Sequence, residues 1–221
     1  MDRMRRVIAK RMRVAATEIP HVTLHREVNA TELLKVHEEL NASMTTTNTH
    51  ISISVLMALA VAIALREYPR INGRTENGEI RLYHQINLGI AVALNDGLAV
   101  PVIRNADQRS TSEFASELNR LVQRARTGTL SLSDVTDGTF TVSNLGAFGV
   151  DYFTPIINPP QLGILGVGAI TTSLRLVEGE LREVPQLGLS LSFDHAALDG
   201  ASGAQFLSMV ARYIESPSVL L

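Results

Sequence analysis

The sequence predicts a single domain of mixed α/β architecture. First, segments with the alternating apolar pattern of β-strands and segments with apolar residues at helical spacing follow one another along the chain. Second, 221 residues, of which 45% are hydrophobic, are enough to bury a full core. Third, no stretch rich in Pro, Ser and Gly interrupts the chain. We therefore expect one domain over residues 1–221 rather than two smaller ones.

Composition excludes several classes of function. The formal net charge of −2 gives no sign of a nucleic-acid partner. The sequence contains no Cys, which excludes disulfides, thiolate metal sites and a cysteine nucleophile, and which suits a reducing compartment. An Arg-rich rather than an apolar run follows Met1, so we predict no signal peptide. The longest apolar window, residues 51–65, is shorter than the roughly 20 residues of a membrane span and predicts a buried helix instead.

The first segments predict an amphipathic helix followed by a strand. The apolar face of the helix carries Met4, Ile8, Met12 and Ala15, with Val7 alongside, and its basic face carries Arg3, Arg5, Arg6, Lys10, Arg11 and Arg13. Such a basic face binds membranes or acidic partners in some proteins, but a solvated face that forms salt bridges is the favoured interpretation. Residues 20–28 alternate as a strand with one polar side. His21 and His25 lie on or near that side, where they do not converge as metal ligands would.

Two capping patterns indicate where helices begin. Asn29 with Glu32, and Ser110 with Glu113, have the spacing of capping boxes. We expect the first helix to run to residue 40 and the second to end before Gly128. The remaining expected elements are a polar loop at 43–49, the buried helix at 51–65, strands at 79–82, 86–94, 98–103, 139–143, 162–170 and 187–193, and hairpin turns at 95–97 and 178–179.

Three closely spaced glycines could be mistaken for a phosphate-binding loop. Gly163, Gly166 and Gly168 lie inside a strand pattern and open no helix. They therefore do not predict dinucleotide binding.

Near its end, the chain places a histidine and a carboxylate where a strand is followed by a helix. The alternation of residues 187–193 stops shortly before His195, and helical spacing begins after Asp199 and continues to Pro217. A side chain at such a junction can be rigidly aimed, and Asp199 can cap the helix or orient the loop. The spacing alone leaves two interpretations open: a helix cap beside a packed histidine, or a catalytic pair.

Six blocks of sequence occur in an order that is characteristic of one family. They are Arg5-Arg-Val-Ile-Ala-Lys-Arg-Met12, Pro20-His21, Gly97-Leu-Ala-Val-Pro-Val-Ile103, Thr139-Phe-Thr-Val-Ser-Asn-Leu-Gly146, Ile156-Ile-Asn-Pro-Pro-Gln161, and Asp194-His195 through Asp199-Gly200. Together they resemble, over nearly the whole chain, the catalytic inner-core domain of the dihydrolipoamide acyltransferases of the 2-oxo acid dehydrogenase complexes. The resemblance implies the two-layer fold of chloramphenicol acetyltransferase, a mixed β-sheet flanked by helices, assembled as trimers with active sites between subunits.

The resemblance also implies catalytic roles. His195 matches the family's histidine and would act as general base on the thiol of dihydrolipoamide or coenzyme A. Ser143 would donate a hydrogen bond to the tetrahedral oxyanion, across the cleft and from a neighbouring subunit in one arrangement that the sequence leaves open. Asp199 would hold the loop that aims the histidine.

Four further residues have supporting roles in this interpretation. Asp199 pairs with an arginine in the family, and Arg5 or Arg6 would supply it; the sequence does not choose between them. Asn144 and Gly200 adjoin the catalytic residues in the matched blocks.

Cofactors and partners follow from the same resemblance. It implies coenzyme A as a substrate, a lipoyl group carried on a domain outside this chain, and no metal. It implies a homotrimer that assembles into a 24-mer or 60-mer core. Decarboxylase and dihydrolipoamide dehydrogenase components would join through lipoyl and subunit-binding domains that this chain lacks, and we expect neither nucleic acid nor membrane as partner. The chain is thus expected to be an excised catalytic domain from the bacterial cytoplasm or, in a eukaryote, the mitochondrial matrix.

The substrate is less firmly indicated than the reaction. Ala196 follows the histidine where most of the family has an arginine, and it resembles the chloramphenicol enzymes at that position. Acetyl or branched-chain acyl groups are favoured over succinyl, and a free-standing acetyl-coenzyme A-dependent enzyme of the chloramphenicol type is the alternative. A non-catalytic scaffold is disfavoured because Ser143, His195 and Asp199 occur together. A serine hydrolase is disfavoured because Ser143 is not in a G-x-S-x-G elbow.

Overall fold

The computed structural model describes residues 3–43, 50–94 and 97–220. Its helices are α1 (Arg3–Glu18), α2 (Thr31–Ser43), α3 (Ile53–Glu67), α4 (Thr111–Arg126) and α5 (Gly200–Glu215). Its strands are β1 (His21–Asn29), β2 (Gly73–Glu76), β3 (Glu79–Leu82), β4 (Leu88–Ile90), β5 (Val92–Leu94), β6 (Gly97–Ala99), β7 (Val102–Ile103), β8 (Phe140–Asn144), β9 (Gly163–Val177) and β10 (Glu180–Asp194). Its short 3-10 helices are η1 (Pro69–Ile71), η2 (Ala106–Gln108), η3 (Leu132–Asp134), η4 (Gly146–Phe148) and η5 (Pro217–Leu220).

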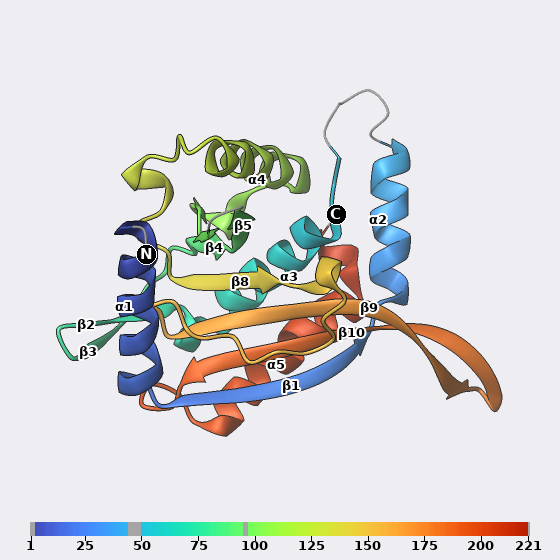
Figure 1. Cartoon of the computed structure of the whole chain (residues 1–221). Helices are drawn as coiled ribbons and strands as arrows, with labels where there is room; N and C mark the ends of the chain where they lie inside the picture. The colour runs from blue at the N-terminus through green and yellow to red at the C-terminus, as the bar shows by residue number, and fades with distance from the viewer. Residues whose placement is uncertain (1–2, 44–49, 95–96, 221) are drawn as a thin grey trace.

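A six-stranded sheet in the order β1-β10-β9-β8-β4-β7 lies at the centre of the molecule (Figure 1). β8 runs parallel to both of its neighbours, β9 and β4, and the other neighbouring pairs are antiparallel. Two small hairpins, β2–β3 and β5–β6, accompany this sheet. Figure 1 shows α3 and α5 together behind the sheet, with α2 and α4 toward its ends. The prediction of a mixed α/β fold with helices flanking a mixed sheet is confirmed.

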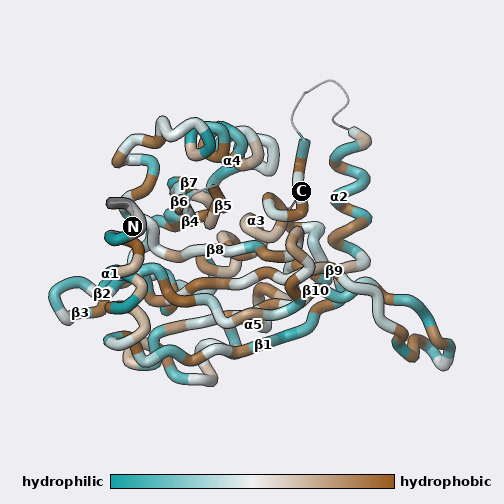
Figure 2. The backbone as a smooth tube through the Cα atoms, in the orientation of Figure 1, coloured by the Kyte–Doolittle hydropathy of each residue, from teal (hydrophilic) through white to brown (hydrophobic). Residues whose placement is uncertain are grey.

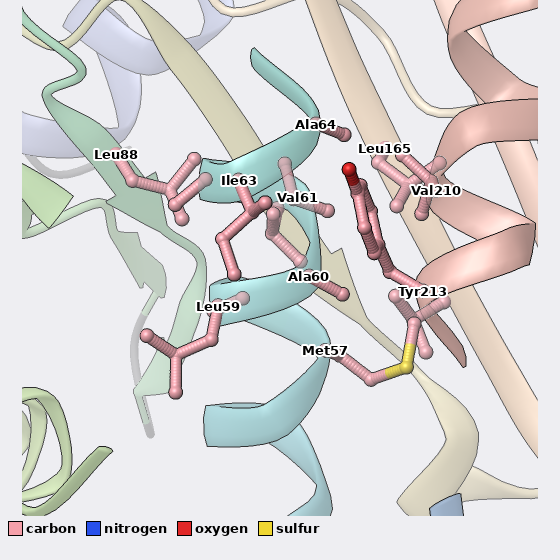
Figure 3. Close-up of a cluster of buried hydrophobic side chains, with 14 of the residues drawn as sticks. Met57, Leu59, Ala60, Val61, Ile63, Ala64, Leu88, Leu165, Val210 and Tyr213 are labelled. Atoms are coloured by element: carbon pink, nitrogen blue, oxygen red, sulfur yellow. The ribbon is translucent and has the colours of Figure 1, made fainter. Parts of the chain in front are cut away.

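The core is built around α3, which is apolar on every side. Residues 55–65 of this helix are all buried. Figure 3 shows Met57 beside Tyr213 of α5 and, on the other side of the helix, Ile63 toward Leu88 of β4. A helix that is hydrophobic all round must be covered all round. The buried helix predicted at residues 51–65 is therefore confirmed, and it supports the sheet from behind.

Residues 151–161, which we call the crossing segment, connect β8 to β9 and run back across the sheet (Figure 1). The segment lies unusually close to the strands. A Cβ atom at Gly166 would lie 2.8 Å from the ring of Phe153, and Cβ atoms at Gly168 and Gly188 would overlap the carbonyl oxygen of Asp151. Glycine in a strand often marks such a close approach. Two of the three glycines noted in the strand pattern therefore make room for a chain segment.

Of the two capping boxes predicted from the sequence, one is present in the structure. The predicted capping box of Ser110 and Glu113 is present at the start of α4. The box predicted at Asn29 and Glu32 is wrong. Asn29 Oδ1 instead accepts the backbone N–H of Thr31 at 2.9 Å, and the Glu32 carboxylate pairs with Lys35.

The predicted strand at residues 86–94 is divided in the structure. It forms β4, in the large sheet, and β5, which pairs only with β6. Leu94 lies opposite Gly97 in that pair, as the predicted hairpin requires. Residues 95–96 of the turn, and 44–49 of the predicted polar loop, lie outside the described residues.

Two exposed features differ from the prediction: the salt bridges expected on α1, and the length of strands β9 and β10. On the basic face of α1, Arg6, Lys10, Arg11 and Arg13 are exposed but form no salt bridge with the described part of the chain. β9 and β10 continue past the other strands as a projecting hairpin with apolar residues near its tip (Figure 2). They are Leu174, Leu176 and Leu181, which are 67%, 72% and 72% exposed. Across the described ranges, no helix combines the length and apolar character needed to span a membrane.

Candidate active site

His195 begins a tight turn immediately after the last residue of β10. Asp194 builds this turn: its side-chain Oδ1 accepts the N–H of Ala196 at 2.9 Å, and its carbonyl oxygen accepts the N–H groups of Ala197 and Leu198 at 3.0 Å. Aspartate favours turns because it bonds to the backbone two residues on. The backbone N–H of His195 donates to the Pro20 carbonyl at 2.9 Å. The main chain of the histidine is thus held on both sides.

The imidazole of His195 is exposed, although its backbone is held firmly. Its ring stacks on the ring of Phe193, with centroids 6.2 Å apart and an interplanar angle of 26°. Phe193 is itself fully buried, and Gly203 of α5 permits this because a Cβ there would lie 2.5 Å from the Phe193 ring. In the described part of the chain, no residue hydrogen-bonds to the nitrogens of the His195 ring. Those nitrogens are therefore available to a thiol.

Asp199 caps α5. Its Oδ1 accepts the backbone N–H of Ser202 at 2.7 Å. Hydrogen bonds from the N–H and hydroxyl of Ser202 lower the pKa of the Asp199 carboxyl, and the positive charge of Arg70 acts in the same direction. The capping role considered from the sequence is confirmed. It also gives the carboxylate a fixed position four residues after the histidine.

The pairing of Asp199 with Arg5 or Arg6 stays a prediction. Arg6 is exposed and forms no ion pair with Asp199, and the side chain of Arg5 lies outside the described part of the structure. Arg70, in η1, is the arginine whose charge acts on Asp199. Arg70 belongs to none of the sequence blocks that carry the family resemblance, so the motifs contained no signal for it.

Ser143 lies near the end of β8, in register with Gly166 of β9 and, beyond it, Ser190 of β10. Side chains at registered positions of neighbouring strands point to the same face of a sheet. The side chain of Ser143 therefore lies on the face where Phe153 covers Gly166. Phe153 of the crossing segment is half-buried and was missed by the sequence analysis. Its ring covers Gly166, the register partner of the half-buried Ser143.

Asn144 faces the other side of the sheet and has a structural role. Its Nδ2 donates to Ser54 Oγ in α3 at 3.0 Å, and its Oδ1 accepts the N–H of Gly146 at 2.8 Å. It therefore fastens the end of β8 to α3. Gly200 is the first residue of α5, and a Cβ at this position would meet nothing within 4 Å. Its place next to the cap is clear, but no close approach requires a glycine there.

The structure does not bring Ser143 and His195 together within one chain. Ser143 is in register with Ser190, and His195 follows Ser190 by five residues along β10. At roughly 3.3 Å per residue, the two lie about 17 Å apart along the strand direction, and they are also two strands apart. Two large surface cavities, of about 580 and 410 Å³, are lined by neither residue. One chain therefore does not bring Ser143 and His195 into one site.

The histidines of β1 are occupied by bonds inside the protein. His21 bonds through both ring nitrogens to backbone groups of Ile19 and Ile157, and His25 Nδ1 lies 2.9 Å from Ser190 Oγ. No group of three or more metal-ligating side chains occurs among the residues that the structure describes.

The fold defines the class first. Chloramphenicol acetyltransferase matches 94% of this chain with a TM-score of 0.57 at 16% identity, a likeness that shows the fold alone. The model of the 2-oxoacid dehydrogenases acyltransferase catalytic domain matches residues 1–221. The chain therefore belongs to the 2-oxoacid dehydrogenase acyltransferase family, as the six sequence blocks predicted.

Individual relatives agree with this assignment. The dihydrolipoyllysine-residue acetyltransferase component of the pyruvate dehydrogenase complex of Rickettsia bellii is 38% identical over 221 residues, which are 100% of this chain and 53% of that protein. The chain spans about half the length of the curated relatives it matches. The dihydrolipoamide acetyltransferase of Azotobacter vinelandii, studied for the catalytic roles of a serine, a histidine and an asparagine, has a TM-score of 0.93 at 31% identity. The cubic core of a pyruvate dehydrogenase multienzyme complex has the same values, and both matches cover 100% of this chain and 91% of the other.

Proposed function

We propose that this protein transfers an acyl group between dihydrolipoamide and coenzyme A, with Ser143, His195 and Asp199 at the site. One observation carries the proposal. In the Azotobacter vinelandii enzyme, the studied serine precedes the histidine by 52 residues, and the asparagine follows the histidine by four. Ser143, His195 and Asp199 have the same two spacings. The residues that the sequence blocks singled out thus coincide in order and spacing with residues studied in a relative of the same fold.

The chemistry that we propose is thioester exchange. The neutral imidazole of His195 accepts the proton of the incoming thiol, and the resulting thiolate attacks the carbonyl carbon of the acyl thioester. A carbon–sulfur bond forms, and the carbonyl oxygen becomes an oxyanion that accepts a hydrogen bond from the Ser143 hydroxyl. When the carbonyl re-forms, the other carbon–sulfur bond breaks, and the departing thiolate takes the proton back from the imidazolium. No oxidant or metal enters this balance.

We infer that the Ser143 and the His195 of one active site come from different copies of the chain. The separation of about 17 Å between Ser143 and His195 along the sheet is far greater than one acyl carbonyl can bridge. A histidine from one copy facing a serine from the next would supply both groups to each site. A cyclic trimer built in this way contains three equivalent sites.

Assembly and partners follow the same proposal. A structural relative with 31% identity forms the cubic core of a pyruvate dehydrogenase complex. We propose that trimers of this chain build such a core and receive the lipoyl group carried by a lipoyl domain. Decarboxylase and dihydrolipoamide dehydrogenase components would supply and reoxidise that lipoyl group.

Acetyl is the acyl group that we propose. The curated relatives act, by name, as acetyltransferases of pyruvate dehydrogenase complexes. The ring of Phe153 packs directly over Gly166, beside Ser143, where a large acyl group would need room. Of the two acyl classes favoured from the sequence, the branched-chain class receives no support from these relatives.

Transfer assays with matched variants test the proposal. Acetyl-, isobutyryl- and succinyl-coenzyme A are offered as donors with dihydrolipoamide as acceptor, and acetyl transfer is expected to be fastest. His195→Ala should lower kcat by about 10²–10⁴-fold, and Ser143→Ala by about 10²–10³-fold, with the assembly intact by light scattering. His37→Leu, a change to a histidine of α2 outside the site, serves as the matched control.

Three outcomes would contradict the proposal. A His195→Ala variant that keeps most of its activity would remove the general base from the mechanism. Acetylation of chloramphenicol but not of dihydrolipoamide would favour the free-standing acetyltransferase. Rapid thioester hydrolysis without a thiol acceptor would favour a hydrolase.

A further inference from the structure

His21, the first residue of β1, joins three segments that are distant in the sequence. Its Nδ1 lies 2.8 Å from the carbonyl oxygen of Ile19, at the end of the α1–β1 connection. Its Nε2 lies 3.1 Å from the backbone nitrogen of Ile157, in the crossing segment. In the sheet, His21 is the register partner of Asp194. His21 thus contacts the chain before β1 and the crossing segment through its imidazole, and the strand that leads to His195 through its backbone.

The bonding partners determine the tautomer of His21. A backbone carbonyl can only accept a hydrogen bond and a backbone N–H can only donate one. Nδ1 therefore carries the proton and donates it to Ile19, while Nε2 is unprotonated and accepts from Ile157. Ile157 is fully buried, so its N–H depends on this acceptor. Only a neutral imidazole in this tautomer satisfies both partners.

The same short region holds the backbone of His195. The carbonyl oxygen of Pro20, which lies between Ile19 and His21 in the sequence, accepts the N–H of His195 at 2.9 Å. Asp194, opposite His21, forms the turn that presents the His195 ring. The bond from His21 Nδ1 holds the carbonyl of Ile19, the residue that precedes Pro20. A displacement of His21 therefore moves Pro20, whose carbonyl oxygen holds the backbone N–H of His195.

We propose that His21 is a positioning residue that aims His195 by fastening residues 19–20 to the crossing segment. The inference rests on the proposed role of His195 as general base. Small misplacements of a reacting group are costly, since a shift of about 1 Å can lower the rate on the order of 100-fold. His21 touches neither reacting group, and its effect passes through the His195 backbone.

Two substitutions separate the hydrogen bonds from the space that the ring fills. His21→Leu removes both the donor and the acceptor, and kcat is expected to fall by about 10-fold or more, with KM for coenzyme A and dihydrolipoamide unchanged. His21→Gln restores one donor and one acceptor on the same side chain and should recover part of that loss. Equal losses in the two variants, or no loss in either, would overturn the proposal.

A double-mutant cycle distinguishes positioning from a general loss of folded enzyme. In a His195→Ala background, His21→Leu should cause no further loss of residual activity, because a residue that acts through another has no effect once the other is gone. If His21→Leu lowers residual activity there by the same factor as in the wild-type background, its role is merely structural and the proposal fails. His37→Leu, carried through the same cycle, should be neutral in both backgrounds.

This design also separates the two levels of inference. If His195→Ala alone keeps most of the activity, the proposed function fails whatever His21 does. If His195→Ala is inactive but His21→Leu retains wild-type kcat, only the positioning role is overturned.

Discussion

Ser143, on β8, and His195, in the turn after β10, are two strands apart and five residues apart along the strand direction. A single copy cannot present both side chains to one carbonyl, because a rise of roughly 3.3 Å per residue separates them by about 17 Å along the strand direction. The proposed function therefore requires that His195 of one copy faces Ser143 of a neighbouring copy.

Complementation between inactive variants tests this pairing. When His195→Ala and Ser143→Ala chains are co-expressed or refolded together, about one quarter of the sites in randomly mixed trimers should contain both intact residues. Activity should reappear well above that of either variant alone, measured as transfer to coenzyme A. Each variant refolded with itself is the control. Mixed oligomers that are confirmed by mass spectrometry and remain inactive would show that the site lies within one chain.

The capping carboxylate of Asp199 should make stability depend on pH. Ser202 lowers the folded-state pKa of this group below its ordinary value of 3.8. A depressed folded pKa contributes stability that is present above the unfolded pKa and is lost as the pH falls through the folded one. Asp199→Asn keeps an oxygen that can cap α5 but loses the charge. The difference in free energy of unfolding between wild type and variant should be constant near neutrality, begin to shrink below about pH 4, and be lost as the pH falls through the folded-state pKa.

Unfolding midpoints in urea, measured from pH 2.5 upward at fixed protein concentration, provide this comparison. Asp199→Ala, which removes the capping oxygen as well, should be less stable than Asp199→Asn at every pH. A wild-type-to-Asn difference that persists unchanged at acidic pH would contradict the lowered pKa.

Phe153 should limit the size of the acyl group. Its ring covers Gly166 next to Ser143, so Phe153→Ala opens space at that position. Discrimination between groups that differ by a methylene in an apolar pocket is worth about 10- to 200-fold. The ratio of kcat/KM for isobutyryl- over acetyl-coenzyme A is therefore expected to rise by at least about 10-fold. Tyr152→Ala, at the neighbouring exposed position, is the control, and an unchanged ratio in Phe153→Ala would place the acyl group elsewhere.

Gly166 should be intolerant of a side chain for the same reason. A Cβ there would lie 2.8 Å from Phe153 Cζ, so Gly166→Ala should lower the free energy of unfolding by about 1–3 kcal/mol. The penalty should shrink when Phe153→Ala is also present, since the two changes share one contact. Gly179→Ala, in the β9–β10 turn, is an uninformative control because its positive φ of 85° adds backbone strain. Gly200→Ala, with nothing within 4 Å of the new Cβ, is the better control.

Local patterns in the sequence were sufficient for much of the fold. The helical spacing of α1, α3, α4 and α5 and the alternation of β1 and β8 predicted elements that the structure confirms. The capping box at Ser110 could be read because both partners lie three residues apart. The pattern at Asn29 had the same spacing and was wrong: α2 begins at Thr31, the N–H of Thr31 bonds to Asn29, and Glu32 pairs with Lys35. Equal local spacing does not decide between competing local partners.

The sequence by itself determined the mixed α/β class, the strand-to-helix junction at His195 and, through its ordered blocks, the family. Only the tertiary structure decided that the charge of Arg70 acts on Asp199, that Phe153 covers Gly166, the register partner of Ser143, and that Ser143 and His195 are separated in one chain. The physical reason is that periodicity and capping depend on residues a few positions apart. Strand order, register and the path of the crossing segment depend on contacts between residues far apart in the chain, which no local pattern encodes.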